Sequence, residues 1–247
     1  MAWVVFSCQT EIKQHTNTLI AEQSIDSLRV EITKPIPLMF DTIISGVRIH
    51  SMDEIDDVSI KAIEFKENTF EKDHITIEVQ KDSDVKAFYS VNNAEVLEFF
   101  SKNRIPLFEG NNVLLMFATN EKGISIKKKN TVYLKNHYSG DGSAHFDNSS
   151  PHLFYHLPKE AIYPMTDAGI LLDFIVVNAE INKNAFSVEV FIDDLKFILP
   201  AWQAYRIEGL SEGKHRIKIR LIDKEGKWVL GPFNDSAYRT FEIKKES

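Results

Sequence analysis

The chain lacks most of the features from which a function is usually inferred. A single cysteine among 247 residues leaves no intramolecular disulfide to be formed. No apolar run approaches the roughly 18–20 residues of a membrane-spanning helix. A Gly-x-Ser-x-Gly nucleophile motif and a glycine-rich phosphate loop are both missing from the sequence. The net charge of −7 argues against a nucleic-acid partner, because phosphate backbones are bound by basic surfaces.

Alternating apolar and polar residues dominate what the sequence does contain. Residues 75–79 and 216–222 alternate with a period of two, which places one face in a core and the other in water. Further strands are predicted at 28–33, 42–49, 59–65, 85–91, 113–118, 123–134, 170–177, 186–192, 196–199, 204–207 and 238–243. Residues 170–177 form an apolar run that only Asp173 interrupts. Short strands separated by turns, with no long amphipathic helix, predict an all-β protein built of sandwiches.

Turn-forming residues divide the chain. Glycine, serine and aspartate at 138–143, followed by asparagine, serine and proline at 148–151, indicate a domain boundary. We therefore predict a polar N-terminal segment at 1–26, an N-terminal sandwich at 27–136, a linker at 137–150 and a C-terminal sandwich at 151–247. The run Lys127-Lys128-Lys129 is expected to be a solvated edge or turn, since lysines on edge strands oppose aggregation.

The only cysteine, Cys8, stands between an apolar run that begins at Trp3 and a polar stretch that begins at Gln9. A short apolar stretch, a small residue, a cysteine and a hydrophilic tether resemble the end of a bacterial lipoprotein signal peptide. The resemblance implies that Cys8 is acylated and that residues 1–26 are a signal remnant and tether. Only seven residues, none of them Lys or Arg, precede Cys8, so either the start codon is placed too late or the match is accidental. The alternative is a free thiol on a short N-terminal arm of a cytoplasmic protein.

Several segments of the second half carry a family resemblance: Pro151-His152-Leu153-Phe154-Tyr155, Leu171-Leu172-Asp173-Phe174, Tyr205-Arg206-Ile207-Glu208-Gly209-Leu210 and Gly231-Pro232-Phe233-Asn234. Together they resemble a family of uncharacterised envelope lipoproteins of Bacteroidetes-type bacteria, often labelled hypothetical or phosphopeptide-binding. The resemblance implies two tandem immunoglobulin-like β-sandwiches behind a lipid anchor in the cell envelope, at the periplasmic or outer-membrane surface. It implies no catalytic residues and no cofactor.

Four of the eight histidines, His137, His145, His152 and His156, gather near the predicted linker. Imidazole is a common ligand of zinc and iron, so a metal-dependent enzyme at this junction is one hypothesis. The spacing has no HExxH helix, and we expect loop or interface residues without a metal instead.

Two further groups are candidate binding sites. The carboxylates of Asp53, Glu54, Asp56 and Asp57 suit calcium, but their spacing lacks the EF-hand glycine, and a solvated acidic loop is expected. Trp202 and Tyr205 could form a stacking platform for a sugar or a peptide, although large aromatics in a sandwich usually belong to the core.

The sequence therefore predicts a non-enzymatic binding or structural module of the envelope. Its partners would be the membrane, through the lipid, and a protein or glycan. A metal-dependent enzyme and a subunit of an envelope assembly that pairs edge strands are the alternatives.

Overall fold

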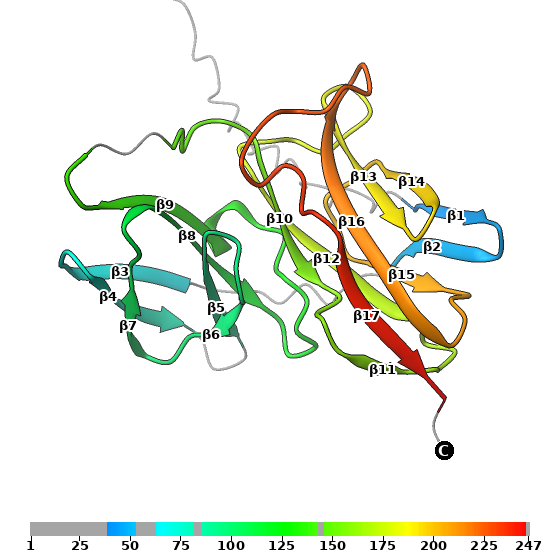
Figure 1. Cartoon of the computed structure of the whole chain (residues 1–247), viewed down its shortest axis with the longest axis horizontal. Coiled ribbons are helices and arrows are strands. Elements are labelled where there is room, and N and C mark those ends of the chain that lie inside the picture. Colours follow the sequence, from blue (N-terminus) through cyan, green and yellow to red (C-terminus); the bar gives the residue numbers. More distant parts are fainter. Residues whose placement is uncertain (1–38, 53–62, 82–84, 143–145, 246–247) are drawn as a thin grey trace, which may run out of the picture. The chain divides into compact units, whose positions relative to one another are not determined.

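The computed structural model describes residues 39–52, 63–81, 85–142 and 146–245 (Figure 1). These residues contain no α-helix; their single helical element is the 3-10 turn η1 at Lys129–Thr131. The predicted strand at 28–33 and the acidic group Asp53, Glu54, Asp56 and Asp57 lie outside the described residues, as does Cys8.

An N-terminal sandwich is built from seven strands. They are β3 (Ile63–Phe70), β4 (His74–Lys81), β5 (Lys86–Val91), β6 (Leu97–Glu98), β7 (Lys102–Pro106), β8 (Gly110–Thr119) and β9 (Val132–Ser139). One sheet has the order β3-β4-β7 and the other β6-β5-β8-β9. Ile75 and Ile77 of β4 share an apolar cluster with Leu114 and Met116 of β8. The clean alternation of residues 75–79 thus packs one face of β4 into this core.

A C-terminal sandwich repeats the same pairing with eight strands. They are β10 (His152–Leu157), β11 (Ile162–Pro164), β12 (Ile170–Val177), β13 (Phe186–Ile192), β14 (Leu195–Leu199), β15 (Tyr205–Glu208), β16 (Gly213–Asp223) and β17 (Arg239–Lys244). The core strands β10, β12 and β15 form one sheet, and β14, β13, β16 and β17 the other, with β11 added parallel to β17.

The two sandwiches share one topology. In each, the first strand pairs with the second, the second with the fifth, the third with the fourth and sixth, and the sixth with the seventh, when β11 is set aside. Two packed antiparallel sheets of this order form an immunoglobulin-like sandwich in which the fourth strand lies in the sheet of the third. The predicted fold class, all-β with two tandem immunoglobulin-like sandwiches, is confirmed.

A hairpin from the start of the described chain extends the C-terminal sandwich. The strands β1 (Asp41–Ile44) and β2 (Val47–Ser51) pair with each other, and β2 pairs with β15, as Figure 1 shows. Ser45 and Gly46 connect the strands with φ of 50° and 84°, the positive values of a tight hairpin turn. The predicted single strand at 42–49 is therefore two strands.

The hairpin also changes the domain boundaries. Val47 and Ile49 belong to the core of the C-terminal sandwich. The prediction that one N-terminal sandwich spans 27–136 thus differs from the structure, because an apolar face finds its partner in space and not in its sequence neighbours. The predicted linker at 137–150 differs as well, since β9 continues to Ser139.

Three strands, β8, β10 and β12, are buried on both faces because the sandwiches meet there. A cluster of Val113, Leu115 and Phe117 from β8 packs against Phe154 of β10 and Ile175 of β12. These side chains point away from the cores formed by their neighbours in sequence. The continuous apolar run at 170–177 therefore reflects a strand with a core on one face and the junction on the other.

Candidate functional site

A buried carboxylate, Asp173 of β12, lies at the junction of the two sandwiches with none of its surface exposed. Its Oδ2 accepts hydrogen bonds of 2.8 Å from the backbone N–H of Ser125 and from Nδ1 of His156. Its Oδ1 accepts from the ammonium of Lys127. Because an ionised carboxylate only accepts, the bond to His156 fixes the hydrogen of that imidazole on Nδ1.

Lys127 reaches this site from the connection between β8 and β9. Its Nζ donates to the carbonyl oxygen of Phe174 at 2.8 Å and to Oγ of Ser125 at 2.5 Å. The same ammonium lies 5.6 Å from the ring centroid of Phe174 and 5.7 Å from that of Trp202, within cation–π range. The expectation that the lysine run is entirely solvated is therefore wrong for Lys127. The predicted strand at 123–134 is interrupted here, and η1 precedes β9.

Electrostatics keep Asp173 ionised. Burial alone would raise the pKa of this carboxyl, but the charge of Lys127 and the hydrogen bond from His156 hold it well below its usual range. The buried pair of Asp173 and Lys127 is stabilising only while both charges are present, because removal of one partner leaves the other charge uncompensated. The network therefore ties the N-terminal sandwich, through Lys127 and Ser125, to the C-terminal one, through Asp173 and His156.

The histidines predicted as a cluster are dispersed. His137 stacks on Phe70 at 5.1 Å, and His152 stacks on Phe146 at 4.6 Å. His156 contacts Asp173 and the edge of Phe117. His145 lies outside the described residues.

No two of these three described histidines share a possible metal-binding group. The described residues thus give no geometric support to a metal-dependent enzyme at the junction. His137 belongs to strand β9 and not to the predicted linker at 137–150, and His152 and His156 lie in β10.

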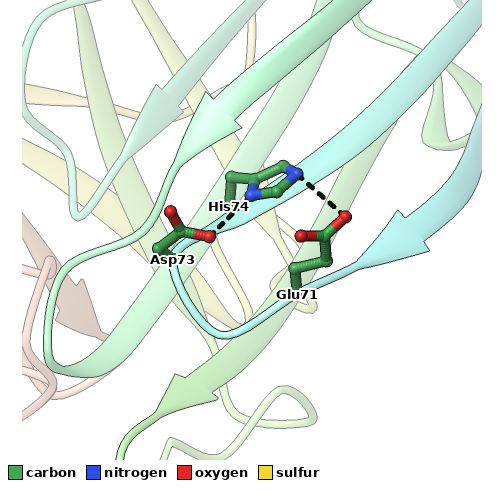
Figure 2. A group of neighbouring side chains, drawn as sticks. All are labelled: Glu71, Asp73 and His74. Atoms are coloured by element: carbon green, nitrogen blue, oxygen red, sulfur yellow. Dashed lines mark hydrogen bonds and ion pairs between the residues drawn. The ribbon is translucent and has the colours of Figure 1, made fainter.

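The one group of potential metal ligands among the described residues is Glu71, Asp73 and His74, in the turn between β3 and β4. Figure 2 shows the imidazole of His74 between the two carboxylates. Asp73 contacts Nδ1 at 2.7 Å and Glu71 contacts Nε2 at 3.3 Å. One ligand atom of each side chain lies within 4.8 Å of the other two, but the two carboxylates contact opposite nitrogens of the imidazole ring. The guanidinium of Arg104, 3.0 Å from Nδ1, adds a positive charge that opposes a cation.

A hollow of about 520 Å³ opens beside Trp202 at the same junction. We call it the Trp202 hollow. Its lining includes Leu134 of β9, Val176 and Val177 of β12, and Asn178, Glu180 and Trp202. The indole N–H of Trp202 donates to the carbonyl oxygen of Phe174 at 3.0 Å, which fixes the ring beside Lys127. The volume lies within the range of small-molecule sites, and an apolar lining with a few polar groups is typical of them.

Tyr205, the second predicted aromatic of a ligand platform, is a core residue. It has none of its surface exposed, and its hydroxyl donates to the carbonyl oxygen of Ala201 at 2.7 Å. Burial raises the pKa of Tyr205. The prediction that Tyr205 contacts a ligand is corrected, because strand β15 turns this ring inward against Phe174 and Phe40. Trp202 stays a candidate.

No pattern in the sequence marked Lys127 as a site residue. A signal for Asp173 was present, since it is the only charge in an otherwise apolar strand and a buried charge needs partners. Its partners Lys127 and His156 stand 46 and 17 positions away along the chain, and no local pattern connects them.

Comparison with known proteins identifies no family. No protein-family model and no curated protein matches the chain. Three similar solved structures are fibronectin(III)-like modules of Clostridium thermocellum CbhA, a fibronectin-III array of RIM-binding protein, and a Bacteroides ovatus protein from a mixed-linkage glucan utilization locus in complex with a heptasaccharide.

The similarity to these structures is low. Their identities are 12%, 9% and 10%, and their TM-scores 0.28, 0.27 and 0.23. They cover 74%, 73% and 78% of this chain, and 94%, 60% and 72% of the respective solved chains. Scores this low carry no functional meaning, and the fold assignment rests on the strand pairing described above. Within the described residues, no helix is long and apolar enough to cross a membrane.

Proposed function

We propose that the protein is a non-enzymatic binding module that takes a neutral glycan in the Trp202 hollow. The observation that carries the proposal is the hollow itself, where an aromatic ring and valine and leucine side chains meet an amide and a carboxylate. Sugars present apolar C–H faces and a rim of hydroxyls. An aromatic and aliphatic floor suits the faces, and Oδ1 of Asn178 and the carboxylate of Glu180 supply acceptors for the hydroxyls. The amide nitrogen of Asn178 already donates to the carbonyl oxygens of Asn148 and Ser150.

The junction supports this role because it makes the hollow rigid. Leu134 comes from one sandwich, and Val176 and Trp202 come from the other. A site between two domains keeps its shape only when the domains are held together. The apolar junction cluster and the Asp173 network supply those contacts.

A catalytic role is less well supported. The pair of Asp173 and His156 has the geometry of a carboxylate orienting an imidazole, with 2.8 Å between them. However, no hydroxyl or thiol of the described residues is hydrogen-bonded to Nε2 of His156, where a nucleophile would stand. Without an activated nucleophile, this pair orients a side chain and does not start a reaction.

Location in the cell envelope, through acylation of Cys8, is part of the proposal and rests on the lipoprotein resemblance. Cys8→Ser should move the protein from the membrane to the soluble fraction, because two acyl chains are what holds such a protein to a bilayer. Unchanged membrane fractionation of this variant would contradict the anchor without bearing on the hollow.

An array of neutral oligosaccharides, probed with the purified protein, tests the binding function. We expect binding to at least one glycan, a loss of tenfold or more in Trp202→Ala, and little change in Trp228→Ala. Trp228 is a matched control, since it is 45% exposed and does not line the hollow. A wild-type protein that binds no glycan, or a Trp202→Ala variant that binds as well as the parent, would contradict the proposal.

A further inference from the structure

A second hollow of about 380 Å³ opens at the junction, and we call it the Arg239 hollow. Its lining includes Tyr155, His156 and Arg239 from the C-terminal sandwich and Glu95 from the N-terminal one, with Lys159 and Glu160. It shares no lining residue with the Trp202 hollow. A ligand of the Arg239 hollow is therefore independent of the proposed glycan site.

Arg239 forms no ion pair with the carboxylates of Glu95 and Glu160, which line the same hollow. Its guanidinium lies 5.1 Å from the ring centroid of Tyr155, and Nη2 donates to the carbonyl oxygen of Asn93 at 3.2 Å. Its Nε is buried and has no hydrogen-bond partner among the described residues. Over that same part of the chain, no carboxylate forms an ion pair with it. Buried cations are normally paired, so a guanidinium that has no ion-pair partner among the described residues retains a charge that can receive an anion.

The neighbouring groups are fixed in ways that leave the hollow open to a ligand. The hydroxyl of Tyr155 donates to the carbonyl oxygen of Pro158 at 2.7 Å. This hydrogen bond fixes the position of the ring that the guanidinium contacts. His156 uses its Nδ1 hydrogen for Asp173, so Nε2 is an acceptor that can receive the hydrogen of a ligand hydroxyl and leaves the carboxylate to Arg239. A stacked guanidinium and an oriented imidazole are preorganised, and preorganisation lowers the cost of binding.

The rim limits the charge of the ligand. Lys159 is the one other cation in the lining, and Glu95 and Glu160 oppose it. Two rim carboxylates repel a dianion more strongly than a monoanion. A planar carboxylate also matches the two parallel donors of a guanidinium.

We infer that the Arg239 hollow binds the carboxylate group of a small organic acid, with Arg239 as its main contact. Phosphate shares the oxyanion chemistry and is the other source of such a group. The volume suits a molecule the size of a monosaccharide or a small organic acid.

Isothermal titration calorimetry with three probes tests this inference: galacturonate, its neutral counterpart galactose, and inorganic phosphate at matched ionic strength. We expect galacturonate to bind, galactose not to bind, and phosphate to bind more weakly than galacturonate. Arg239→Gln should weaken galacturonate binding tenfold or more, and Arg239→Lys should weaken it less. Arg216→Gln is the matched control on the adjacent strand β16, since Arg216 pairs with Asp194 on the surface.

If Arg239→Gln does not fold, a second pair of variants tests the same site without changing Arg239. Glu95→Gln and Glu160→Gln alter only the exposed rim, and each should tighten galacturonate binding by removing a repulsive charge. Tighter binding of phosphate than of galacturonate would assign the hollow to phosphate and overturn the carboxylate assignment. Absence of binding by galacturonate and phosphate alike, or an unchanged affinity in a folded Arg239→Gln variant, would overturn the site.

Discussion

Replacing Asp173 by Asn is the most informative perturbation of the junction. The substitution keeps the shape of the side chain but removes the charge that faces Lys127, whose side chain is 16% exposed. Breaking a buried ion pair by removing one partner costs about 3–5 kcal/mol, because the remaining charge is left uncompensated. The amide introduced at position 173 would present either its NH₂ group or its weaker acceptor oxygen to the N–H groups of His156 and Ser125, and either orientation weakens these hydrogen bonds. We expect a loss of about 3–5 kcal/mol in the free energy of unfolding.

Urea unfolding at pH 7, followed by tryptophan fluorescence, measures this loss. Asp194→Asn is the matched control, since Asp194 is 93% exposed in its pair with Arg216 and surface pairs contribute about 0–1 kcal/mol. The double variant Lys127→Met with Asp173→Asn should lose less than the sum of its single variants, because it leaves no unpaired ammonium. A loss below about 1 kcal/mol in Asp173→Asn would refute the buried pair.

The pH dependence of stability tests the same pair in a second way. The pKa of Asp173 in the folded protein lies below its ordinary value. The ionised carboxylate of Asp173 therefore makes its full contribution to the free energy of unfolding above about pH 4, and this contribution is lost as the pH falls toward the pKa of the folded state. The stability difference between the parent and Asp173→Asn should be constant from about pH 5 to 7 and should shrink below about pH 4. A difference that stays constant down to about pH 2 would show that Asp173 is not the titrating group.

Three further outcomes are expected. Ile49→Ala should lower the free energy of unfolding in urea by about 2–4 kcal/mol, since Ile49 is fully buried in the C-terminal core. Ile43→Ala should lower it by less than about 0.5 kcal/mol, because Ile43 is 65% exposed, and equal losses would contradict the placement of the hairpin. Hydrogen bonds from Ser149 and Ser150 lower the pKa of Asp147 to about 2, so Ser149→Ala should raise the value found by NMR titration, and an unchanged pKa would exclude that bond. Metal analysis of the purified protein should find less than one zinc per chain, and stoichiometric zinc that His74→Gln removes would make the turn at β3 and β4 a metal site.

Local patterns predicted the strands but not their partners. The turn at Ser45 and Gly46 was recognisable as a hairpin signal within the alternating residues 42–49. That the hairpin pairs with β15 was not, because the pairing joins residues more than 150 positions apart. Alternation in the sequence shows which face of a strand is apolar. It does not show which of the two sandwiches buries that face. A fragment of residues 151–247 would therefore lack Val47 and Ile49 of its own core.

The candidate site shows the same limit. Lys127 and its two neighbours form one charge run, yet only the position of Asp173 in space decides that Lys127 is buried. Trp202 and Tyr205 are three residues apart and equally aromatic. The loop before β15 leaves Trp202 at the edge of a hollow, and the strand turns Tyr205 into the core. Residue type alone does not separate these two outcomes.

The position of a bound glycan is the decisive measurement for the proposed binding function. For an oligosaccharide that the array identifies, intermolecular NMR contacts can be measured between sugar protons and protein side chains. We expect contacts with the ring of Trp202 and with the methyl groups of Leu134 and Val177, which line one hollow from two sandwiches. Contacts confined to the exposed rings of Trp228 and Tyr238 would place the ligand on the outer face of the C-terminal sandwich and contradict binding in the Trp202 hollow.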